Sequence, residues 1–153
     1  MSVLNWFKRI VGGEDIPAEA NAPSDGTASL HGLDVMATID AHMAWKSRLE
    51  SFIRGQSDET LKIENIRPDN LCSLGQWIYG EGHDHFGHLP VFKQVRQEHA
   101  RFHLCAARTL DLAAQEGEAR ALEELNRGDY SRASQRVKHL LAQLYLEAKN
   151  EHP

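Results

Sequence analysis

The sequence predicts an all-α protein, a four-helix bundle with an additional short helix and an N-terminal amphipathic segment. Three observations indicate this class. Apolar residues recur at three- and four-residue steps over long segments, as they do on the buried face of a helix. Most glycine and proline residues lie between these segments rather than within them. No segment shows the alternation of apolar and polar residues that is typical of a half-buried strand.

The first 28 residues are expected to be separate from the bundle, which we place at residues 29–150. Residues 1–11 (MSVLNWFKRIV) can form about three turns of amphipathic helix. The following residues up to 27 include two prolines and several small residues, and they predict a mobile linker. The aromatic and basic side chains of the first segment suit a membrane surface, a partner helix or a frayed tail.

Five segments of the bundle region carry the helical pattern. Gly55 lies where a helix would end, and Pro90 suits the first turn of the next long helix. Residues 56–70 are expected to connect irregularly, and residues 81–88 to form a loop rich in glycine and histidine. The expected helices span residues 29–54, 71–79, 90–115, 118–126 and 129–148. The expected core faces comprise Val35, Ile39, His42, Leu49 and Ile53, then Phe92, Val95, His99, Phe102, Ala106, Leu110 and Ala113, and finally Val137, Leu140, Leu141, Leu144 and Ala148.

The composition excludes several classes of protein. The chain has 153 residues, 41% of them apolar, which suffices for one domain with a real core. Its 17 basic and 22 acidic residues give a net charge of −5, which argues against a nucleic-acid-binding protein. No run approaches the roughly 18 apolar residues of a membrane span. The N-terminus lacks the pattern of a secretory signal, so we expect a cytoplasmic protein with reduced thiols.

Nine histidines stand out, and two of them have the spacing of a metal-binding pair. His99 and His103 lie four residues apart on a predicted helix, so both imidazoles project from one face. Both lie on or beside the apolar stripe and should point into the bundle. His42 lies in the inward stripe of another helix, where burial costs free energy unless the ring is hydrogen-bonded or coordinated. Asp40 and Glu98 neighbour these histidines and are candidates to hydrogen-bond to a ligand.

Cys72 is the fourth candidate ligand. It lies in the first turn of the short helix, which Asp69 or Asn70 can cap. A helix N-terminus favours the thiolate, which is the form that binds metal. Three imidazoles and one thiolate suit Zn²⁺ in a tetrahedral site.

The residues around these ligands resemble a known family, the chemoreceptor zinc-binding (CZB) domain. The segment LCSLGQWIYG at residues 71–80 is similar to the family signature C-x-L-G-x-W-x-Y-G. The segment HMAWK begins at His42, and the segment EHARFH contains His99 and His103, resembling the family element H-x-x-F-H. The resemblance extends over residues 30–148.

The resemblance implies a zinc site of three histidines and one cysteine at His42, Cys72, His99 and His103. Members of the family are four-helix bundles, often homodimers, and most are modules of bacterial chemoreceptors or diguanylate cyclases. They are implicated in sensing zinc, or hypochlorous acid through the zinc-bound cysteine. The resemblance therefore implies a zinc-dependent sensory domain in chemotaxis or cyclic-di-GMP signalling, with a chemoreceptor, kinase or cyclase as its partner.

The sequence leaves one alternative function open and argues against two others. The protein could be a metal-stabilised adaptor or a zinc store without a sensory role. An enzyme is not expected, because four protein ligands leave no open position for a catalytic water. A hemerythrin-like di-iron carrier would need more inward histidines and bridging carboxylates than the sequence offers.

Two further features could carry chemistry. His83, His85 and His88 crowd the predicted loop and could relay metal or form a second site, although such loops are more often polar surface. Cys105 is expected roughly on the other side of its helix from His103, as a small apolar residue that is buried or partly exposed. A disulfide between Cys72 and Cys105 under oxidation is conceivable but is not the expected state.

Overall fold

The computed structural model describes residues 28–151, and 76% of the structure is helical. This confirms the all-α class. The long helices are α2 (Val35–Ile53), α6 (Pro90–Glu116) and α8 (Asp129–Glu151), with α7 (Glu118–Arg127) between the last two. The shorter elements are β1 (Ser29–Leu30), β2 (Leu33–Asp34), α3 (Ile63–Ile66), α4 (Ser73–Ile78) and α5 (Glu81–Phe86).

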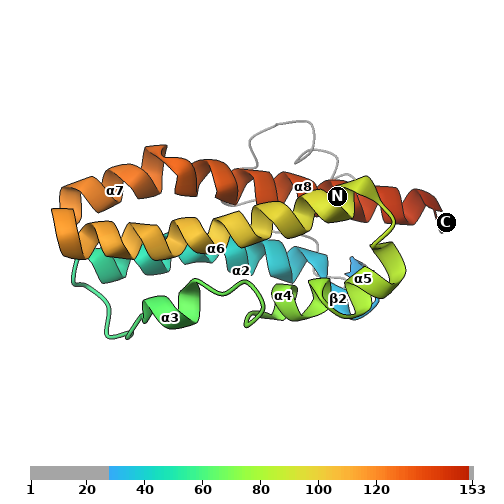
Figure 1. Cartoon of the computed structure of the whole chain (residues 1–153), viewed down its shortest axis with the longest axis horizontal. Helices are drawn as coiled ribbons and strands as arrows, with labels where there is room; N and C mark the ends of the chain where they lie inside the picture. Colours follow the sequence, from blue (N-terminus) through green and yellow to red (C-terminus); the bar gives the residue numbers. More distant parts are fainter. Residues whose placement is uncertain (1–27, 152–153) are drawn as a thin grey trace.

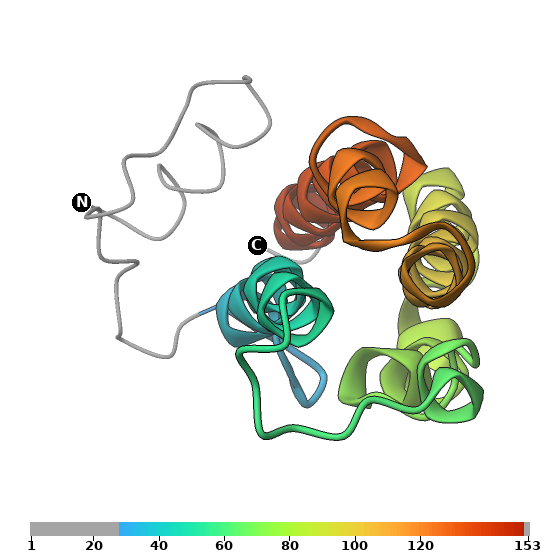
Figure 2. The ribbon, with the colours of Figure 1, turned by 90° about the vertical axis from the view of Figure 1, so that its left-hand side faces the viewer.

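The elements surround one core at four corners. Helix α6 runs along α7 and α8, which follow one another in nearly the same line (Figure 1). Viewed end-on, α2 occupies a third corner, and the short helices α3, α4 and α5 together occupy the fourth (Figure 2). The predicted four-helix arrangement therefore has one side built from short segments rather than from one long helix.

The helical periodicity correctly predicts the core. In α8 all five predicted inward residues are buried, and in α6 six of the seven are buried, Ala113 being half-buried. In α2 four of the five are buried and Ile53 is half-buried. Three of the buried positions are histidines rather than apolar residues, namely His42, His99 and His103. The core thus contains a polar cluster that packing alone does not explain.

The beginning of the first long helix differs from the prediction. Residues 29–34 form an antiparallel hairpin with two residues in each strand, and α2 starts only at Val35. Gly32 turns the chain with a φ of +88°, a conformation that favours glycine. Asp34 then caps α2, because its side chain accepts a hydrogen bond from the Ala37 N–H at 3.0 Å. These local turn and cap preferences override the helical pattern of the first six residues.

The segment before α6 is more helical than predicted. The expected connection 56–70 contains the single turn α3, and the expected loop 81–88 contains α5. Helix α5 has no apolar periodicity, but Phe86 is buried and Gly82 lies against the indole of Trp77. A β-carbon at Gly82 would come within 2.6 Å of that ring, so the glycine permits this close packing. The predicted ends at Gly55, with φ +69°, and at Pro90 are confirmed.

The expectations for residues 1–27 concern a part of the chain that this structure does not describe. The amphipathic segment and its linker, including any membrane or partner contact, lie outside the described residues. Among residues 28–151, none of the helices combines the length and apolar character that a membrane crossing requires.

Candidate metal centre

Helix α6 supplies two imidazoles to the middle of the core. His99 and His103 lie one turn apart on its inward face, where they are 0% and 5% exposed. Their Nε2 atoms are 3.0 Å apart. The predicted pairing of these two histidines on one helical face is therefore observed.

Helix α2 supplies a third imidazole from across the core. The Nδ1 of His42 lies 2.9 Å from the Thr38 carbonyl oxygen, one turn earlier in α2. Since a carbonyl only accepts, this Nδ1 carries the hydrogen, and the Nε2 of the neutral ring holds a lone pair. That buried Nε2 has no hydrogen-bond partner within the part of the chain that the structure describes. The ring centroid of His42 is 5.3 Å from that of His99.

The short helix α4 supplies the sulfur. Cys72 is its N-cap residue, in place of the predicted Asp69 or Asn70, and its Sγ accepts a hydrogen bond from the Gly75 N–H at 3.4 Å. The Sγ lies 3.3 Å from the Nε2 of His99 and 3.6 Å from the Nε2 of His103. A β-carbon at Gly75 would lie 1.8 Å from the Asp69 carbonyl oxygen. Glycine at this position therefore allows the helix to start where it presents the thiol to the histidines.

The four predicted residues together form one cluster, which we call the ligand cluster (His42, Cys72, His99 and His103). One ligand atom from each lies within 4.8 Å of all the others. Tetrahedral zinc with Zn–N bonds of about 2.0–2.1 Å and a Zn–S bond of about 2.3 Å separates its ligand atoms by about 3.3 Å (N to N) and about 3.6 Å (N to S). Among His99, His103 and Cys72, the observed 3.0 Å between nitrogens and 3.3 and 3.6 Å between nitrogen and sulfur are equal to these separations or about 0.3 Å shorter.

Hydrogen bonds orient the lone pairs toward one point. The Nδ1 of His103 donates to the Ile66 carbonyl oxygen at 2.7 Å, so its Nε2 also presents a lone pair. The Nε2 atoms of His42 and His103 therefore both need a donor or a cation. The Thr38 and Ile66 carbonyls fix the rings in the tautomer that binds metal through Nε2. A bound cation would satisfy all the converging atoms at once.

Burial keeps these imidazoles neutral. Loss of hydration and, to a smaller extent, the neighbouring His103 and His42 together lower the pKa of His99 to about 2. Loss of hydration is also the main cause of the lowered pKa of His42 and of His103. A neutral imidazole is the form that coordinates metal, so the protein does not have to displace three protons to bind a cation.

The pKa of the Cys72 thiol differs from the expectation. Burial raises the pKa of Cys72, and the N–H groups at the start of α4 oppose this shift only in part. The cap position alone therefore does not produce the thiolate, contrary to the sequence-based expectation. The positive charge of a metal ion would supply the missing stabilisation, because a coordinated thiol is deprotonated.

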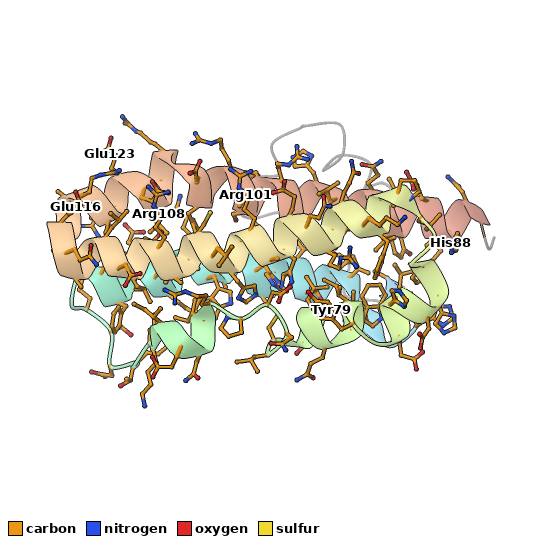
Figure 3. All side chains as sticks on the ribbon, in the orientation of Figure 1. Tyr79, His88, Arg101, Arg108, Glu116 and Glu123 are labelled. Carbon is orange, nitrogen blue, oxygen red and sulfur yellow. The ribbon has the colours of Figure 1, made fainter. Side chains whose placement is uncertain are left out.

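The other candidate residues do not join the ligand cluster. His83 and His85 are exposed on α5, where His85 bonds to Glu81 at 3.2 Å and stacks on His31. His88 lies at the turn from α5 to α6, near one end of the molecule (Figure 3). This group therefore does not extend the metal centre, and its possible role as a second site stays a prediction.

Cys105 and the two acidic neighbours are also placed apart from the cluster. Cys105 is buried, which is one of the two expected states, and both cysteines are free thiols in this structure. Glu98 accepts a hydrogen bond from the Arg136 Nε at 3.1 Å, and Asp40 is exposed; in the described part of the chain neither bonds to a ligand. The carbonyls of Thr38 and Ile66 take the role proposed for these carboxylates. Backbone carbonyls carry no sequence signal, although Thr38 lies four residues before His42 on a predicted helix.

The fold and the cluster define a class of protein: a helical bundle with an interior site of three histidines and one cysteine that fits zinc. The family model of the chemoreceptor zinc-binding domain (CZB) matches residues 42–110. The match over residues 42–110 is what a protein with a chemoreceptor zinc-binding domain would give, and it agrees with the motifs. The match contains the whole ligand cluster, and it is shorter than the expected span of residues 30–148. Neither a curated protein nor a solved structure matches the chain.

Proposed function

We propose that this protein is a zinc-binding sensory or regulatory domain whose signal arises at the ligand cluster. The observation that carries the proposal is the convergence of four ligand atoms, within 4.8 Å, from three separate helices. His42, Cys72, His99 and His103 would hold Zn²⁺ as its protein ligands. Bound zinc would supply a fixed positive charge that joins α2, α4 and α6 and keeps the cysteine as thiolate.

The element that carries Cys72 is suited to move when the site changes. Helix α4 has six residues, compared with 19 in α2 and 27 in α6, so it can shift with the loss of fewer backbone hydrogen bonds than the long helices, although Leu74, Trp77 and Ile78 are buried. The indole N–H of Trp77, on α4, donates to the His31 carbonyl oxygen at 3.1 Å. Displacement of α4 would therefore be transmitted to the hairpin that leads into α2.

Two signals could act on this switch. One is the zinc concentration itself. The other is an oxidant: the thiolate of Cys72 and hypochlorous acid would give sulfenic acid and chloride, with oxygen transferred to sulfur. Either would weaken the link between α4 and the histidines. In keeping with the family, we place the domain in bacterial chemotaxis or cyclic-di-GMP signalling, acting as a homodimer or toward a chemoreceptor, kinase or diguanylate cyclase.

The alternative function is a zinc-binding adaptor or a zinc store without sensing, in which the metal never leaves in the cell. Four protein ligands and a buried position favour tight binding, as in structural zinc sites. We do not propose catalysis, because the cluster fills all four tetrahedral positions.

Amide hydrogen exchange with and without zinc distinguishes these functions. A sensory domain should show faster exchange in α4 and in residues 29–34 after zinc removal, while the centres of α6 and α8 stay protected. Cys72→Ser should resemble the zinc-free protein, and the matched control Cys105→Ala should resemble the parent. Unchanged exchange in α4 after zinc removal would contradict the switch, and zinc that resists removal by chelators would favour the adaptor.

A further inference from the structure

The four ligands are not equally enclosed. His42, His99 and His103 are buried, whereas Cys72 is half-buried. The metal centre is therefore closest to the surface on its sulfur side.

A cavity of about 330 Å³ lies on this side of the centre. Its walls come from the hairpin, the first turns of α2 and the start of α4. Cys72 and His42 both line it, whereas His99 and His103 do not. The cavity therefore ends at two of the four ligands and opens away from the other two.

The remaining sides of the centre are covered by protein. The Ile66 carbonyl of α3 lies against the Nδ1 of His103. The ring of Phe102 lies 5.3 Å from the ring of His42. His99 is fully buried on the inward face of α6. Because these groups cover the other sides, the cavity is the shortest route from solvent to the ligand atoms among the described residues.

The cavity has features that suit the passage of a hydrated cation. Asp34 places a carboxylate in its wall, and the hydroxyl of Thr38, also in the wall, bonds to the Asp34 carbonyl oxygen at 2.7 Å. On the α2 side the wall includes Ala37 and Ala41, which are exposed and one turn apart. Because these side chains are small, the cavity stays open next to the site.

We propose that this cavity is the entry and exit route for zinc and for small metal-binding molecules, with Ala37 and Ala41 keeping it open. The proposal rests on the proposed function, because it assumes that the ligand cluster binds zinc. A larger side chain in the wall raises the barrier for both entry and exit. Neither Ala37 nor Ala41 supplies a ligand atom or a side-chain hydrogen bond to one, so the equilibrium affinity should change much less than the two rates.

Stopped-flow kinetics on the full chain test this route. Zinc uptake by metal-free protein and zinc release to excess EDTA are measured for the parent and for Ala41→Phe. We expect both rates to fall by about tenfold or more in Ala41→Phe, while the dissociation constant stays within about threefold of the parent value. The control Leu104→Phe adds an aromatic ring to an exposed position of α6 outside the cavity, and it should leave both rates unchanged.

The outcomes separate the route from the proposed function. Unchanged rates in an Ala41→Phe protein that binds zinc would overturn the route but not the zinc site. A weaker affinity with faster release would also overturn it, because the substitution would then act by distorting the site. If the parent itself takes up no zinc, the proposed function fails. If circular dichroism shows that Ala41→Phe does not fold, Ala37→Leu decides between the same readings.

Discussion

Replacement of Cys72 by alanine should weaken zinc binding strongly while leaving the bundle folded. Structural zinc sites bind with about 10–16 kcal/mol, so one of four ligands accounts for about 2.5–4 kcal/mol, or about 10²–10³ in the dissociation constant. The same substitution removes the N-cap contact of α4 with the Gly75 N–H, which should loosen a helix of only six residues. The long helices α2, α6 and α8, with 19, 27 and 23 residues, do not depend on this contact.

The assay combines a competition titration against a chromophoric chelator with far-ultraviolet circular dichroism on the same samples. We expect the loss of affinity together with a helical signal close to that of the parent. Cys105→Ala is the matched control, because it removes the other thiol from a buried position that contacts no ligand, and its zinc affinity should equal that of the parent. Loss of helix in proportion to loss of zinc would refute the reasoning, because zinc would then be required for folding.

Three further predictions follow from the same geometry. His103→Ala should weaken zinc binding by about 10²-fold or more, whereas His88→Ala should change it by less than about threefold; equal losses in the titration would contradict the assigned ligands. Gly75→Ala places a β-carbon against the Asp69 carbonyl, so α4 must shift and the affinity should fall, unlike in Ser73→Ala on the same helix. The metal-free protein should lose stability in acid. Burial lowers the pKa of the three cluster histidines below 6.5, so the unfolded chain takes up more protons. This stability is complete above about pH 6.5 and falls below it, which urea titrations at neutral pH and at about pH 5 would detect; equal midpoints would refute it.

The long helices could be predicted because their buried faces leave a periodic pattern in the sequence. The hairpin at residues 29–34 has only two residues per strand, which is too short for an alternating pattern to show. Helix α5 differs from the predicted loop for another reason. Its sequence, EGHDHF, has no apolar stripe, and what holds it is tertiary contact, with Phe86 buried and Gly82 against Trp77. Such contacts cannot be seen in the local sequence.

The ligands of the metal centre could also be predicted, but their surroundings could not. The spacing of His99 and His103 and the signature around Cys72 are local patterns, and the structure brings them together with His42. The carbonyls of Thr38 and Ile66 are backbone groups, and the second comes from a separate segment. The pKa of Cys72 illustrates the same limit: its position before α4 can be read from the sequence, whereas the burial that raises the pKa depends on the whole fold.

The most direct test of the central claim is the metal content of the untagged protein, purified without added metal and measured by elemental mass spectrometry. The account predicts about one zinc per chain in the parent protein. It also predicts loss of that zinc when Cys72 and His103 are both replaced by alanine, under the same purification. A parent protein with no zinc, or with mainly iron, would contradict the zinc site and the sensory function built on it.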